Sequence, residues 1–181
     1  MKKHGLASVI TALAILTAAL VAAPIASAAT WYLPGASETP GQNGAYYSST
    51  LWVTNSGASP ASVEFRFIPF AGTAAASPVV RTLQAGETRE YEKVLPTLFS
   101  LAKGAGTIVL VADGSVVATM STANTADPKG TFGLAVRPVA ESELAGAGAK
   151  HEVVFASHKE DLKTASRTNV SAVLVDPNTS F

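Results

Sequence analysis

The sequence contains no cysteine and only three histidines among its 181 residues. The lack of cysteine excludes a disulfide framework, thiol chemistry and thiolate-bound metal. His4 lies near the start of the chain, whereas His151 and His158 lie beside the carboxylates of Glu152 and Glu160. In a strand, the odd spacing of the last two histidines places their imidazoles on opposite faces. We therefore predict solvated histidines around a charged turn, with no metal site and no cofactor.

Charged residues are also scarce, at 14% of the sequence, and 13 Lys and Arg balance 13 Asp and Glu. Without a basic stripe, there is no electrostatic case for a nucleic-acid partner. The sequence also lacks Gly-x-Ser-x-Gly, a Walker loop and a calcium-binding Asp-x-Asp-x-Asp-Gly loop. Glu87, Glu90 and Glu92 lie around Tyr91 in a pattern typical of the solvated face of a strand. We predict that the protein is not an enzyme, and a hydrolase with an unrecognised site is the least favoured alternative.

Long apolar runs are absent except at the N-terminus, where the pattern is that of a secretory signal peptide. Lys2 and Lys3 precede an apolar stretch over residues 6–21, and Ala26-Ser27-Ala28 provides a small-x-small cleavage site. The sequence thus predicts a signal peptide over residues 1–28 and a secreted protein, periplasmic or extracellular. No later stretch is long and apolar enough to span a membrane.

Strand patterns dominate the rest of the chain. In residues 61–67, apolar side chains alternate with Ser62, Glu64 and Arg66, which indicates a strand with one buried face. Residues 46–55 alternate in the same way. Because turn-forming residues fill the stretch between them, at 55–60, we expect these two runs to be neighbouring antiparallel strands.

A second hairpin is expected where Asp113-Gly114 separates two β-branched runs, since Asp-Gly favours the turns that match strand twist. The nearly continuous apolar run at 107–112 predicts a central strand. One helical signal interrupts the strands: Leu95, Leu98 and Phe99 follow helical spacing, and Gly104 is a plausible C-terminal cap.

These patterns predict an all-β fold, an antiparallel β-sandwich with one short helical turn, over residues 29–145. Residues 146–181 are interpreted as a linker followed by terminal strands. The alternating run at 169–175 leaves three alternatives open. It pairs within the same domain, which we favour; it is exchanged with another copy of the chain; or it begins a truncated second repeat.

Five short motifs follow one another in a characteristic order: TLWVTN (50–55), LQAGE (83–87), VLPTLF (94–99), GAG (104–106) and GTFG (130–133). This order resembles that of secreted bacterial Ig-like β-sandwich modules, which occur in tandem in cell-surface and extracellular proteins. The resemblance covers residues 31–145. It implies a structural or adhesive role outside the cell, and it supplies no catalytic residues.

Aromatic residues gather in the first quarter of the chain that follows the signal peptide. Trp52 alternates with Leu51 and Val53, so it belongs to the opposite face of its strand. If that face is open, Trp52 together with a tyrosine such as Tyr46 is able to stack on a sugar ring or anchor a partner protein. The leading hypothesis is a secreted, non-catalytic structural or adhesion protein whose partner is a protein or a polysaccharide at the cell surface. The alternative is a carbohydrate-binding module that uses Tyr46 and Trp52.

Overall fold

The computed structural model describes residues 28–126 and 132–144, and within them β-strands dominate. The strands are β1 (Ala29–Pro40), β2 (Tyr46–Asn55), β3 (Ala61–Pro69), β4 (Val79–Leu83), β5 (Thr88–Tyr91), β6 (Gly104–Ala112), β7 (Val116–Asn124), β8 (Phe132–Val136) and β9 (Val139–Ala140). Three short helical segments accompany them: η1 (Gln42–Gly44), α2 (Val94–Phe99) and η2 (Glu141–Glu143). The predicted signal peptide and the linker with its terminal strands lie outside the described residues.

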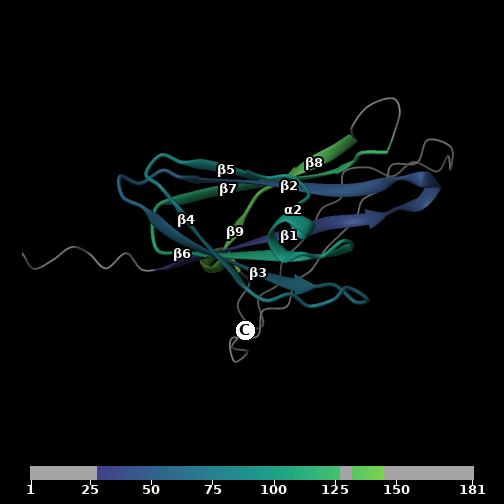
Figure 1. Cartoon of the computed structure of the whole chain (residues 1–181), viewed down its shortest axis with the longest axis horizontal. Coiled ribbons are helices and arrows are strands. Elements are labelled where there is room, and N and C mark those ends of the chain that lie inside the picture. Colours follow the sequence, from purple (N-terminus) through teal and green to yellow (C-terminus); the bar gives the residue numbers. More distant parts are fainter. Residues whose placement is uncertain (1–27, 127–131, 145–181) are drawn as a thin grey trace, which may run out of the picture.

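The nine described strands form one antiparallel sheet in the order β4-β3-β6-β1-β2-β7-β8, with β5 paired to β2 and β9 paired to β1. This confirms the all-β, antiparallel prediction. The sheet folds over on itself: β5, β2, β7 and β8 lie in one layer of Figure 1, and β6, β3 and the first part of β1 lie in the other.

Strand β1 joins the two layers because it pairs with β6 along most of its length and with β2 only at its end. The register shifts between Pro34 and Ala36, where Gly35 has a φ of 81°. Only glycine adopts this left-handed conformation without strain, so Gly35 permits the bulge at which β1 changes direction. Strand β1 was not predicted from the sequence, because Pro34 and Gly35 interrupt the alternation by which a strand is recognised.

The apolar side chains of the two layers meet in one core. The alternation predicted for β2 and β3 is confirmed: Leu51, Val53, Val63 and Phe65 are fully buried, and the residues between them are partly exposed. The predicted central strand is β6, which lies between β3 and β1. The core also includes Leu33, Leu83, Val94, Leu95, Ile108, Leu110 and Met120.

Both predicted hairpins are wrong. Strands β2 and β3 do not pair with each other, and neither do β6 and β7; in each case the turn leads from one layer to the other. At the second turn, the Asp113 carboxylate accepts a hydrogen bond from the Ser62 N–H at 2.6 Å, and the Asp113 N–H donates to the Ser62 carbonyl at 3.2 Å. Gly114 is not among the described glycines with positive φ, which a type I′ turn requires. Asp113 therefore attaches this turn to the start of β3 and does not close a hairpin.

The predicted helical turn is confirmed as α2, which buries Val94, Leu95, Leu98 and Phe99. The C-terminal cap of α2 is Ser100. The prediction of Gly104 as this cap is therefore wrong. Ser100 has a φ of 56°, and its N–H bonds to the carbonyl of Pro96 at 3.1 Å. Gly104 instead begins β6.

Candidate functional site

The two aromatic residues predicted to form a site, Tyr46 and Trp52, do not come together. Both belong to the face of β2 that carries Ser48, Thr50 and Thr54, opposite the core face. They are six residues apart on one strand, which separates them by about 20 Å at the usual rise of 3.3–3.4 Å per residue. A single sugar ring therefore cannot contact both aromatic rings.

Trp52 lies on the outward side of the sheet and is half-buried between the neighbouring strands. Its cross-strand partners are Glu90 on β5 and Thr119 on β7, and both are exposed. The indole thus lies in a row of polar side chains and is the main apolar group of that row.

Tyr46 belongs to a polar cluster at the end of the β1–β2 hairpin. Glu38 is almost fully buried, and its carboxylate accepts a hydrogen bond from the Ser48 hydroxyl at 2.8 Å. A hydrogen bond with the same carboxylate is the main cause that raises the pKa of the Tyr46 phenol. The Tyr46 N–H donates to Asn124 Oδ1 at 3.0 Å. These bonds give Tyr46 a part in joining β1, β2 and β7.

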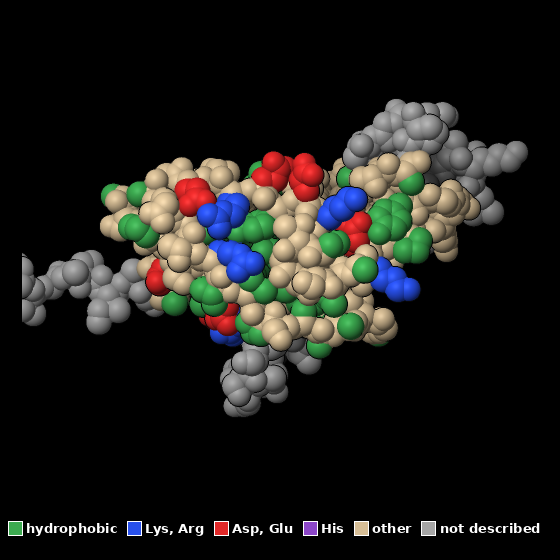
Figure 2. All heavy atoms as spheres, viewed as in Figure 1, with side chains coloured by type: hydrophobic (Ala, Val, Ile, Leu, Met, Phe, Trp, Pro, Cys, Tyr) green, Lys and Arg blue, Asp and Glu red, His purple; other side chains and the backbone are tan. Residues whose placement is uncertain are grey.

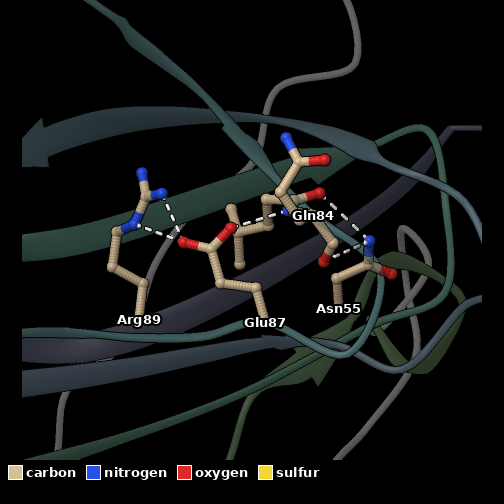
Figure 3. Close-up of polar contacts among 5 residues, drawn as sticks. Asn55, Gln84, Glu87 and Arg89 are labelled. Atoms are coloured by element: carbon tan, nitrogen blue, oxygen red, sulfur yellow. Dashed lines mark hydrogen bonds and ion pairs between the residues drawn. The ribbon is translucent and has the colours of Figure 1, made fainter.

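Asn55 joins two turns that are far apart in the sequence (Figure 3). Its fully buried amide Nδ2 donates to the carbonyl of Ser59 at 2.8 Å and to those of Leu83 and Gln84 at 3.1 Å each. Its Oδ1 accepts from the N–H of Gly57 at 2.9 Å. Two of the motifs quoted above, TLWVTN and LQAGE, are therefore in direct contact through one side chain.

The LQAGE turn has its own support. Gly86 has a φ of 72°, and the Glu87 carboxylate accepts the Gln84 N–H at 2.6 Å and pairs with Arg89. These hydrogen bonds, from Gln84 first and then Arg89, hold the pKa of the Glu87 carboxyl below its usual value. Figure 3 shows Glu87 between Gln84 and Arg89. The titratable groups here stabilise a turn.

A groove lies beside strand β8, and the sequence did not predict it. It encloses about 740 Å³ and is lined by Pro34 and Gly35 of the β1 bulge, by Tyr47, Phe70 and Thr122, and by residues 133–136 of β8. Leu134 is 64% exposed and Tyr47 is 37% exposed, so apolar side chains at the groove face solvent. The sequence signal was weak, because these residues come from five separate stretches of the chain.

Hydroxyl groups connect the strands beside the groove in a continuous chain. The Ser37 N–H donates to Ser49 Oγ at 2.8 Å, and Ser49 and Thr122 share a hydrogen bond of 2.7 Å. The Thr122 hydroxyl donates to the Gly35 carbonyl at 3.0 Å, so Ser49 is the donor in the shared bond. The hydroxyl protons of Ser49 and Thr122 are thus both donated in bonds that hold the β1 bulge against β2 and β7. Because these protons are already used, the groove offers a largely apolar surface.

Charged groups of both signs are scattered over the described part of the molecule, and some of them form separate ion pairs. Figure 2 shows red and blue side chains interspersed with green ones, with no continuous field of one sign on this face. The ion pairs among the described residues include Arg66–Glu64 at 2.8 Å and Arg137–Glu143 at 3.0 Å. Within residues 28–126 and 132–144, no group of three or more histidine or acidic side chains is arranged to hold a metal ion. His151 and His158 lie outside the described residues.

Comparisons with known proteins do not assign a family. No family model matches the chain, and a search of curated proteins finds no significant match. Among solved structures, the one titled "Crystal Structure of Thermotoga maritima 1070" is similar to it with 16% sequence identity and a TM-score of 0.44, over 60% of this chain and 91% of that chain. Similarity at this level carries no inference. No helix in the described part of the chain is long and apolar enough to cross a membrane.

Proposed function

We propose that the protein is a secreted, non-catalytic interaction module with an Ig-like β-sandwich fold, and that it binds an extended segment of a partner protein by adding it to strand β8. The observation that carries the proposal is the exposed strand β8 next to an apolar groove. Secretion and the Ig-like assignment rest on the signal-peptide pattern and on the order of motifs described above.

The edge of β8 offers backbone groups for a new strand. Among the described strands, β8 pairs with β7 alone and ends the strand order of the sheet. Unpaired backbone N–H and C=O groups on such an edge bind extended peptides through main-chain hydrogen bonds. Gly133 brings β8 close to β7, because a Cβ at this position would lie 2.6 Å from the Ala123 Cβ and the Thr122 carbonyl.

The groove offers a place for the side chains of the added strand. In strand addition, backbone pairing provides affinity and pockets for alternate side chains provide specificity. Leu134, Tyr47 and Phe70 are apolar lining residues, so an aliphatic or aromatic side chain of the partner is the group that fits. Burying an exposed leucine in the complex contributes about 1.5–3 kcal/mol, which is a tenfold to hundredfold gain in affinity.

A peptide-display screen against the full chain tests the proposal. Peptides selected from a random library are synthesised, and their dissociation constants are measured by fluorescence anisotropy. Leu134→Asp is expected to weaken binding at least tenfold. The matched control is Val117→Asp on β7, which is similarly exposed at 61% but turned away from the groove, and it is expected to change affinity less than twofold.

Equal losses in the two variants, or a library that yields no specific peptide, would refute binding at β8. Secretion is tested separately by expressing the whole sequence in a bacterial host and identifying the N-terminus of the exported protein by mass spectrometry. An exported product that begins at Ala29 is the expected result.

Carbohydrate binding by Tyr46 and Trp52 stays a prediction. No contact among the described residues favours it. Because the two rings lie about 20 Å apart on β2, a polysaccharide would have to contact each of them separately. A glycan array probed with the wild type and with Trp52→Ala distinguishes this function from peptide binding.

A further inference from the structure

The outward face of strands β3, β6 and β1 buries apolar side chains that do not belong to the core. Tyr32 on β1 and Val109 on β6 are cross-strand neighbours, and they are 5% and 2% exposed. Neither is part of the core cluster, which contains the alternate residues Leu33, Ile108 and Leu110. On the outward face of the other layer, by contrast, Val117 is 61% exposed. Around Tyr32 and Val109, a sheet face that ordinarily meets solvent is almost closed to it.

Two polar atoms on the same face are buried without a hydrogen-bond partner. Thr107 is fully buried, and its Oγ1 has no partner; it lies two residues before Val109 on β6 and thus on the same face. Arg66, the cross-strand neighbour of Val109 on β3, bonds Glu64 through Nη2, but its Nε is buried and unpaired. Buried polar groups are almost always hydrogen-bonded in folded proteins, so these two atoms indicate that this face receives a further polar segment.

We propose that this face, defined by Tyr32, Arg66, Thr107 and Val109, is the docking surface for the C-terminal segment 145–181 of the same chain, with the apolar run at 153–155 covering Val109. The segment's backbone supplies hydrogen-bond partners for Thr107 Oγ1 and Arg66 Nε. Its apolar side chains cover the Tyr32 ring and the Val109 methyl groups.

The course of the chain leads to this face. Strand β9 pairs with β1 at Trp31 and Tyr32, and η2 follows directly at Glu141–Glu143. The pairing of β9 with Tyr32 places the last described residues beside the proposed docking surface. There, burial first and then the nearby negative charge of Glu141 raise the pKa of the Tyr32 phenol.

The length and sequence of the segment fit the distance to be covered. Residues 145–151, AGAGAKH, are mostly small and precede the apolar run Val153-Val154-Phe155. Seven extended residues reach about 23 Å, whereas β1 and β3 are two strand spacings apart, about 10 Å. The stretch after Leu144 is therefore long enough to bring the first apolar run to Val109.

Cysteine labelling tests the proposal in the full chain, because the chain has no cysteine of its own. Single variants Val109→Cys, Val117→Cys and Ile108→Cys report on the docking surface, the exposed opposite face and the core. In the parent chain, we expect Val109→Cys to react with a thiol reagent at least tenfold more slowly than Val117→Cys. Replacing residues 153–155 by serine should accelerate labelling of Val109→Cys at least tenfold, while Ile108→Cys stays protected and thus excludes global unfolding.

A matched triple substitution separates this segment from other occupants. Serine at Val170, Val173 and Val175 removes a similar amount of apolar surface further along the chain and should leave the labelling of Val109→Cys unchanged. The proposal is overturned if Val109→Cys reacts as fast as Val117→Cys in the parent. It is also overturned if protection survives the 153–155 substitutions, or if protection decreases on dilution, which would assign the face to a second copy of the chain.

Discussion

Replacing Asn55 tests whether one buried amide holds the β2–β3 turn against the β4–β5 turn. The side chain bonds four backbone groups, of which the Leu83 carbonyl is the one in a buried bond. In Asn55→Ala, a buried carbonyl left without a donor costs about 1–3 kcal/mol. The carbonyls of Ser59 and Gln84 and the Gly57 N–H are only partly buried, so water recovers most of their bonding. We expect a total loss of about 3 kcal/mol.

In a second variant, Asn55→Asp, the loss of stability relative to the wild type should depend on pH. The carboxylate of this variant would face three carbonyl oxygens in a buried site, so the protonated form is favoured and the folded-state pKa rises above the unfolded value of about 3.9. Each unit of that rise costs about 1.4 kcal/mol at neutral pH. A group whose pKa is raised in the folded state contributes stability below its unfolded pKa, and this contribution is lost as the pH rises through the folded-state pKa. The stability gap to the wild type should therefore narrow as the solution is acidified.

Urea denaturation followed by circular dichroism and tryptophan fluorescence measures these effects between pH 3.5 and 7.5. Asn124→Ala is the control, because Asn124 also lies at a strand end and accepts two N–H bonds, at 3.0 and 3.1 Å, in a more exposed setting. It should cost about 1 kcal/mol. The reasoning is refuted if Asn55→Ala stays within 0.5 kcal/mol of the wild type, or if the gap between Asn55→Asp and the wild type does not change with pH.

Two further predictions concern other polar groups. The Tyr91 hydroxyl is buried and makes no hydrogen bond of normal geometry, although the nearby Arg89 opposes the rise in its pKa that burial causes. The Tyr91 ring packs edge-on against Phe65 at 5.4 Å. Because the hydroxyl is poorly satisfied, Tyr91→Phe should leave the free energy of unfolding unchanged or raise it by up to about 1 kcal/mol, and a clear decrease would contradict this reasoning. Because the pKa of Glu87 is lowered, its contribution to stability is present above the unfolded pKa of about 4.3 and disappears as pH falls through the folded value. Below that pH, the denaturation midpoint of Glu87→Gln should therefore decrease less steeply with falling pH than the midpoint of the wild type. The same pH dependence of the midpoint in both proteins would contradict this prediction.

Local patterns predicted several of the segments that become strands, but they missed β1 and did not predict how the strands pair. The alternation in residues 61–67 was sufficient to assign the buried face of β3, since side chains alternate across any strand. The hairpin expected at Asp113-Gly114 did not form, because the carboxylate of Asp113 bonds Ser62, a residue 51 positions earlier in the chain. A turn dipeptide carries no information about such a distant partner.

The candidate site could be predicted only in part for the same reason. Trp52 was assigned to the outward side of its strand, and the structure places it there. The groove beside β8 was missed, because Tyr47, Phe70 and Leu134 have no common signal in the sequence and meet only after the sheet folds over.

The sequence by itself determined the strand-rich character of the described part, its two-residue periodicity and the buried helical turn at 94–99. These properties depend on backbone preference and on which side chains avoid water, and both act over a few neighbouring residues. The tertiary structure decided the strand order, the crossing of β1 from one layer into the other, the contact of Asn55 with Leu83 and the burial of Val109 outside the core. Such contacts join distant parts of the chain, and they exist only once the whole sheet has closed around its apolar interior.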